Sequence, residues 1–207
     1  MNVHASFAVM LLAMLSTSSV SAAECKYKQN ETDMFTKQRV ITTEWDSLKS
    51  GTSKVFGKVL GDWSDFEVGG MREGEQLFLR FKVELSDTAW HEPLDSQLKN
   101  AVLIPDGTSL TVVMADKSEV LLYAEKAVWG RTTAEPDNGV YVVRSTLVAS
   151  YPLNEETAQA LAAQEASHVS MTVHRTHFEF GMDGRFVELD IHDKSKGGIR
   201  DAIDCLK

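Results

Sequence analysis

The chain has 207 residues, of which 43% are hydrophobic and 25% are charged, and its formal net charge at pH 7 is −9. This length fits one domain, or two small ones packed closely together. No run of lysine or arginine could follow a phosphate backbone, so nucleic acid is not an expected partner.

The first 23 residues have the features of an export signal. They contain no Lys, Arg, Asp or Glu, and an apolar stretch over residues 5–15 is followed by small residues up to Ala23. An uncleaved membrane anchor is the alternative, but a spanning helix needs about 20 apolar residues and this run stops at Ser16. We therefore expect a signal peptide at 1–23 and a single mature domain at 24–207, periplasmic or secreted, without a transmembrane segment.

Alternating apolar and polar residues predict strands in the first half of the expected mature chain. Residues 39–43 resemble a short strand, and Leu77 to Leu85 places an apolar residue at every second position. Residues 86–100 show no such period and include Pro93. A long surface loop is expected there.

Turn sequences separate further strands. Residues 110–114 and 120–123 flank a polar turn and predict a hairpin. Asp106-Gly107 and Asn138-Gly139 predict two more turns, because glycine tolerates the positive φ that such turns require. Residues 140–150 predict another long strand.

The last third of the chain predicts two helices around a hairpin. Asn154 can cap a helix that runs to Ala166, and residues 199–206 place apolar side chains on one face of a short final helix. Strands at 169–180 and 186–192 flank a turn at 183–184. Because turns rather than helices join the strands, we expect an α+β fold. Its core would be a mainly antiparallel sheet or small sandwich, with one mid-chain helix and a short C-terminal helix.

The two cysteines, Cys25 and Cys205, lie near the two ends of the expected mature chain. An isolated pair in an exported protein is normally oxidised, so we expect a disulfide between them. Two free thiols or an intermolecular bridge are the alternatives. The long loop between the cysteines indicates a structural staple rather than a redox site, which would carry a CxxC motif.

Short segments in a fixed order extend over most of the expected mature chain. They are Cys25-Lys26-Tyr27, residues 30–36, Val40, Thr42, residues 74–81, the strand pair around Gly107, Tyr151-Pro152-Leu153, a helix with Leu161, and the cysteine near the C-terminus. In this order the chain resembles a loose group of exported bacterial proteins to which no activity is assigned. The resemblance implies a secreted or periplasmic β-rich domain whose end cysteines are bonded, and it carries over no catalytic residue. Residues 86–100 do not follow the pattern.

The C-terminal hairpin offers a candidate metal site. With Asp183-Gly184 as a two-residue turn, His177 would face Asp190, and a bulge near Arg175 would bring His174 to the same face. Imidazole and carboxylate groups are ligands of Zn²⁺ and Cu²⁺. The candidate ligand set is His174, His177, Asp190 and His192. The alternative is an exposed polar ladder without a metal.

Residues Trp90, His91 and Glu92 form a candidate binding loop. Pro93 and Asp95 exclude an H-E-x-x-H zinc motif, and no Gly-x-Ser-x-Gly turn presents a serine nucleophile. We therefore expect an exported, non-catalytic domain that binds an unidentified protein or small ligand and uses no cofactor. Two alternatives are a metal-binding protein or metal-dependent hydrolase that uses the C-terminal hairpin, and an inhibitor of an extracellular enzyme that inserts residues 86–100.

Overall fold

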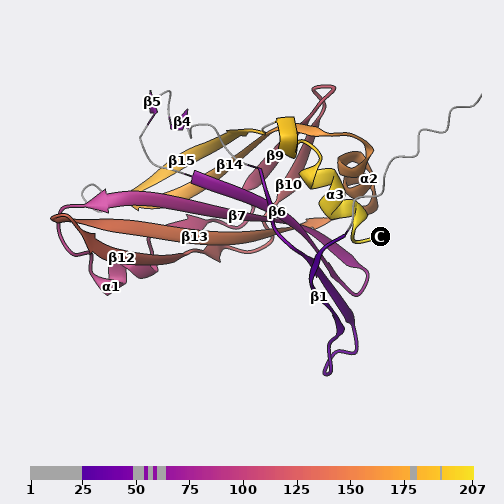
Figure 1. Ribbon diagram of the computed structural model, residues 1–207, viewed down its shortest axis with the longest axis horizontal. Helices are drawn as coiled ribbons and strands as arrows, with labels where there is room; N and C mark the ends of the chain where they lie inside the picture. Colours follow the sequence, from indigo (N-terminus) through magenta and orange to yellow (C-terminus); the bar gives the residue numbers. More distant parts are fainter. Residues whose placement is uncertain (1–24, 49–53, 56–57, 60–63, 178–180, 192) are drawn as a thin grey trace, which may run out of the picture.

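The computed structural model describes residues 25–48, 54–55, 58–59, 64–177, 181–191 and 193–207. The expected signal peptide and His192 lie outside these residues. The described chain has the predicted α+β fold, in which antiparallel strands predominate (Figure 1).

Two antiparallel sheets make up most of the molecule. The first follows the order β1 (Tyr27–Thr32), β2 (Arg39–Thr43), β6 (Ser64–Glu73), β7 (Gln76–Ala89), β13 (Val140–Leu153) and β12 (Arg131–Asp137), with β3 (Asp46–Ser47) also paired to β6. The second follows the order β10 (Glu119–Tyr123), β9 (Ser109–Met114), β14 (Ala166–His177), β8 (Val102–Ile104) and β11 (Val128–Trp129), with β15 (Gly181–Asp190) also paired to β14. Strands β4 (Lys54–Val55) and β5 (Lys58–Val59) pair with each other.

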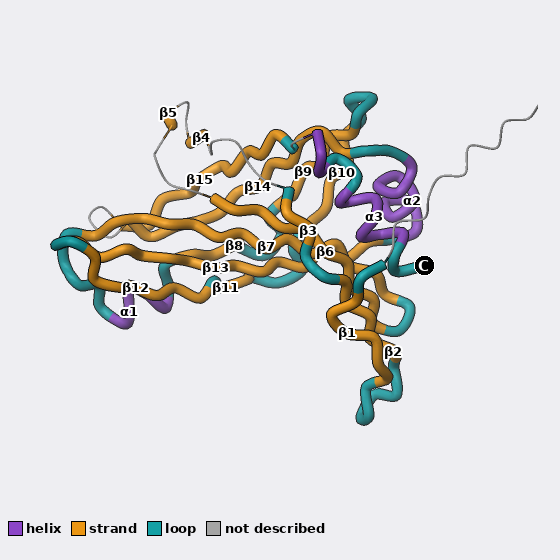
Figure 2. Tube along the Cα trace, in the orientation of Figure 1, coloured by secondary structure: helices purple, strands orange, loops and turns teal. Residues whose placement is uncertain are grey.

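The helices are short and lie at the ends of the sheets. They are α1 (Asp95–Lys99), α2 (Glu155–Ala163), α3 (Gly198–Asp204) and a 3₁₀ turn at Asp193–Ser195. Helices α2 and α3 lie together at the same end as the C-terminus (Figure 2). No helix in the described ranges has the length and apolar character needed to cross a bilayer.

Local sequence signals explain where the main elements begin and end. The Asn154 side chain accepts a hydrogen bond from the Thr157 backbone N–H at 2.8 Å, so α2 begins at the predicted cap. The β12–β13 hairpin turns at Asn138 and Gly139, which have φ of 48° and 88°. Both predictions are confirmed, because each depends on contacts within a few residues.

The core lies between the two sheets and is closed at one end by α3. Strand β7 buries Leu79, Phe81 and Val83 and turns the residues between them outward, which confirms the predicted alternation. These side chains join one apolar cluster with residues of β9, β13, β14, α2 and α3. The predicted apolar face of the final helix is buried as well. It consists of Ile199, Ala202, Ile203 and Leu206.

The first two strands, β1 and β2, extend beyond the body as an arm (Figure 1). All six residues of β1 are exposed. The turn at the tip is ordered by Asp33, whose carboxylate accepts hydrogen bonds from the backbone N–H groups of Phe35 and Thr36 at 2.9 and 2.6 Å. These bonds lower the pKa of Asp33, because they stabilise the ionised carboxylate.

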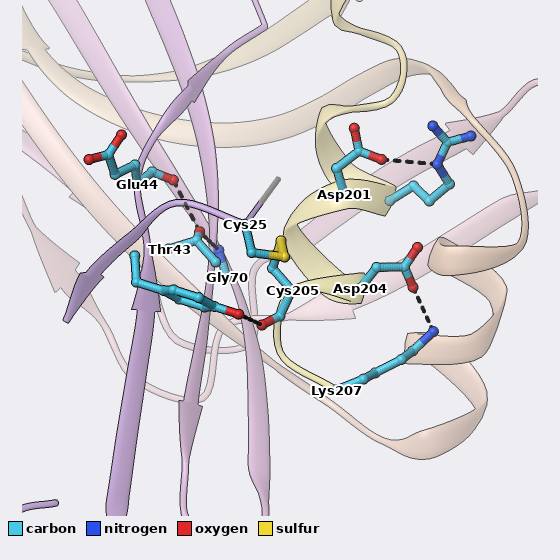
Figure 3. Close-up of a disulfide and its surroundings, with 10 residues drawn as sticks. Cys25, Thr43, Glu44, Gly70, Asp201, Asp204, Cys205 and Lys207 are labelled. Atoms are coloured by element: carbon cyan, nitrogen blue, oxygen red, sulfur yellow. Dashed lines mark hydrogen bonds and ion pairs between the residues drawn. A yellow bond between two sulfur atoms is a disulfide. The ribbon is translucent and has the colours of Figure 1, made fainter. Parts of the chain in front are cut away.

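A disulfide joins the base of this arm to the C-terminal helix (Figure 3). Cys25 and Cys205 are bonded as predicted, with their Cα atoms 5.4 Å apart across a sequence separation of 180 residues. The Tyr27 hydroxyl donates a hydrogen bond to the Cys205 carbonyl at 3.2 Å. The two ends of the described chain are therefore held together by a covalent bond and a hydrogen bond.

The predicted loop at 86–100 is wrong at both of its ends. Residues 86–89 continue β7 and pair with β13, and residues 95–99 form α1. Helix α1 has only five residues, so no helical period could be read from its sequence. The Leu94 backbone N–H donates to the Gln97 side chain at 2.8 Å and fixes the start of this helix.

Candidate functional site

The first sheet has one face against the core and one face turned outward. Strand pairing aligns Gln29, Thr42, Met71 and Phe78 in one row across β1, β2, β6 and β7. A neighbouring row aligns Gly69, Arg80 and Ser150 on β6, β7 and β13. Because alternate residues on a strand share a face, both rows lie on the outward face, opposite Leu79 and Phe81.

Arg80 lies over an aromatic ring at the centre of this face. Its partner on β6 is Gly69, and a Cβ atom at that position would lie only 3.2 Å from the Trp45 ring. Glycine therefore leaves room for the ring to lie against β6. The Arg80 guanidinium carbon lies 4.7 Å from the centre of the Trp45 ring, within the range of a cation–π contact.

Arg80 has no carboxylate partner within the described residues. Its Nε atom is buried and has no hydrogen-bond partner there. Burial lowers the pKa of Arg80, since desolvation penalises the charged form. Buried polar atoms normally have a hydrogen-bond partner, so the enclosed Nε atom of this half-buried arginine calls for an explanation.

Lys82 shows the ordinary arrangement on the same strand and the same face. Its Nζ atom lies 2.9 Å from a Glu67 carboxylate oxygen and 2.6 Å from a Glu84 carboxylate oxygen. Hydrogen bonds to Glu84 and Glu67 raise the pKa of Lys82, whereas the pKa of Arg80 is lowered. Two cations only two residues apart therefore differ in their surroundings: carboxylates stabilise the charge of Lys82, whereas burial disfavours the charge of Arg80.

Arg80 lines an open depression of about 580 Å³, here called the Arg80 depression. Its lining residues are Lys28, Gln29, Asn30, Glu31, Val40, Thr42, Met71 and Arg80. Lys28 is the extra residue of a β-bulge, because Tyr27 pairs with Thr43 while Gln29 pairs with the adjacent Thr42. Bulges redirect side chains and are common beside binding sites. The bulge thus places a second cation at the hollow that Arg80 lines.

A smaller hollow of about 220 Å³ lies beside the disulfide. Glu44, Asp46 and Asp201 line it together with Lys26. Burial, followed by the charge of Asp201, raises the pKa of Asp46. The Asp201 carboxylate also accepts a hydrogen bond from Arg200 at 3.1 Å (Figure 3). This hollow is acidic and opposite in character to the Arg80 depression.

The C-terminal hairpin has a different register from the predicted one. Asp183 and Gly184 lie inside β15, opposite Arg175 and His174, so the predicted turn at these residues is wrong. The observed register places Val169 opposite Leu189 and Met171 opposite Val187. It therefore aligns apolar residues with the buried positions of β14, and this long-range requirement outweighs a local Asp-Gly turn signal.

The new register separates the candidate metal ligands. His177 pairs with Gly181 at one end of the β14–β15 ladder, whereas Asp190 pairs with His168 at the other. At about 3.4 Å per residue, these ends lie about 30 Å apart. His174 pairs with Gly184, and His192 lies outside the described residues. The structure does not bring His174, His177 and Asp190 to one metal ion, and the rest of the described chain holds no group of three or more metal-binding side chains.

The candidate binding loop remains exposed although it is shorter than predicted. Trp90 is 71% exposed, as expected, and His91 and Glu92 are exposed beside it. Pro93 is buried and anchors the segment before α1. These three residues form a surface turn and do not line either hollow described above.

Sequence reasoning missed the residues around the Arg80 depression. The alternation from Leu77 to Leu85 makes Arg80 a polar residue of an ordinary strand, and it gives no reason to expect Trp45 or Lys28 nearby. Two features mark the site, the glycine opposite Arg80 and the bulge at Lys28. Both are defined by strand pairing, so the sequence alone does not reveal them. Comparison with protein-family models, curated proteins and solved structures finds no match to this chain.

Proposed function

We propose that the protein is an exported, non-catalytic binding protein whose ligand occupies the Arg80 depression. The observation that carries the proposal is the half-buried Arg80, which has no carboxylate partner within the described residues although Lys82 on the same face has two. An uncompensated charge destabilises a fold. Such groups are typical of binding sites, where function takes precedence over stability.

Two further features support the export of this chain. The uncharged apolar leader at residues 1–23 is typical of a signal peptide. The disulfide between Cys25 and Cys205 suits an oxidising compartment, because cytosolic proteins rarely keep such bonds. We propose that the mature chain works in the periplasm or outside the cell.

The proposal predicts that Arg80→Met does not destabilise the protein. Methionine keeps much of the apolar contact with Trp45 and removes the uncompensated charge, so the free energy of unfolding should stay within about 0.5 kcal/mol or rise by up to about 1 kcal/mol. Urea unfolding measures this difference.

Lys82→Met is the matched control on the same face of β7. It leaves Glu67 and Glu84 without their shared cation, and the free energy of unfolding should fall by about 1 kcal/mol. A loss of about 2 kcal/mol or more in Arg80→Met would show that Arg80 serves the fold and would contradict the proposed function.

A further inference from the structure

We propose that the Arg80 depression binds a carboxylate group, held by Arg80 and Lys28. This inference rests on the proposed function and names the chemical class of the ligand.

The guanidinium of Arg80 is prepared for a planar anion. Trp45 lies 4.7 Å from its central carbon and supports one side of the group. Its Nε atom is enclosed by the protein, so a ligand meets the terminal amino groups. Two parallel N–H donors match the two oxygens of a carboxylate. Because Arg80 is not committed to any internal acceptor in the described chain, these donors are available to a ligand.

The charges around the depression favour a single negative charge on the ligand. Lys28 and Arg80 contribute two positive charges and Glu31 contributes one negative charge. Glu31 accepts a hydrogen bond from the side chain of Gln29 at 2.6 Å. The balance of one positive charge is neutralised by a carboxylate. A phosphate ester carries about 1.5 to 2 negative charges at pH 7 and would leave an excess beside Glu31.

The remaining lining suits the carbon skeleton of an organic acid. Val40 and Met71 supply apolar surface beside the two cations, and Thr42 lies next to Met71 in the row that joins β1 to β6. The other six lining residues are polar or charged, so the depression offers hydrogen-bonding groups to a polar organic acid and apolar contact to a short carbon skeleton. The same chemistry would accept a small organic acid or the C-terminus of a peptide.

The test follows the indole N–H signal of Trp45 by NMR at constant ionic strength and pH 7. The probes are acetate, inorganic phosphate, a dialanine peptide with a blocked N-terminus and a free carboxylate, and the same peptide with its C-terminus amidated. Wild type is compared with Arg80→Met, and Arg144→Met is the matched control. Arg144 lies on the outward face of β13, is exposed, and has its own partner in Glu135 at 3.9 Å.

Acetate and the free-acid peptide should shift the Trp45 signal saturably in wild type and in Arg144→Met, and the amidated peptide should not. Phosphate should bind more weakly than acetate. Arg80→Met should weaken carboxylate binding at least about tenfold, since a charge-assisted hydrogen bond is lost. Tighter binding of the peptide than of acetate would identify a peptide terminus as the ligand, and equal binding would identify a small acid; both support the inference.

Two results would overturn the inference in different ways. Tighter binding of phosphate than of acetate would refute the carboxylate assignment and leave the proposed function intact, because Arg80 would still hold a ligand. An unchanged response in Arg80→Met, or no response of wild type to any anion, would refute both the inference and the Arg80 depression as a binding site.

Discussion

Replacing Cys25 and Cys205 together by alanine should lower the free energy of unfolding by about 2–5 kcal/mol. The disulfide closes a loop of 180 residues, and it restricts the unfolded chain more than a short loop would. It also holds α3 against the base of the arm, where Tyr27 donates to the Cys205 carbonyl. Urea unfolding of the oxidised wild type and the double variant measures the difference.

Reduced wild type serves as the control for this experiment. It should unfold at the same urea concentration as the double variant, because both lack the covalent link while the wild type keeps both sulfur atoms. A double variant as stable as oxidised wild type would contradict a structural role for the disulfide.

Gly70→Val should destabilise the protein by about 3 kcal/mol through overpacking. Gly70 lies on β6 against α3, and a Cβ atom there would lie 2.6 Å from the Ala202 carbonyl oxygen and 2.8 Å from Leu206 Cδ1. The backbone oxygen cannot move without displacing the helix. The Gly70 N–H also donates to the Thr43 hydroxyl at 2.8 Å, so the strand is held in place from its other side (Figure 3).

Gly198→Ala is the corresponding control in the same region. A Cβ atom at Gly198 lies 3.4 Å from Leu48 and Val68, which is ordinary contact, and alanine favours the helix that begins there. Thermal unfolding should show a large decrease for Gly70→Val and little change or an increase for Gly198→Ala. Equal effects of the two substitutions would show that α3 does not pack tightly on β6.

Much of the fold could be predicted because its signals are local. The alternation in β7 reports which side chains face the core, and the cap at Asn154 and the turn at Asn138-Gly139 each depend on two to four residues. The cysteine pair could be predicted from the compartment that the leader indicates. The strand, the helix cap and the turn depend on residues that are neighbours in the sequence. The disulfide depends on thiol chemistry in an oxidising compartment.

The parts that could not be predicted depend on long-range pairing. The register of the C-terminal hairpin is determined by apolar residues of β14 that face the core between the two sheets, and this outweighs the local Asp183-Gly184 turn signal. Arg80 belongs to the polar side of an ordinary alternating strand. Its unusual environment arises from Trp45 and Lys28, which lie 35 and 52 positions earlier in the chain. The candidate site could be recognised only once these segments were side by side.

Native mass spectrometry of the protein purified from the compartment in which it accumulates tests the central claim most directly. Wild type should carry a non-covalent organic acid that is lost on mild activation, and Arg80→Met purified in the same way should not. Identical spectra of the two proteins would contradict the assignment of the Arg80 depression as the ligand site.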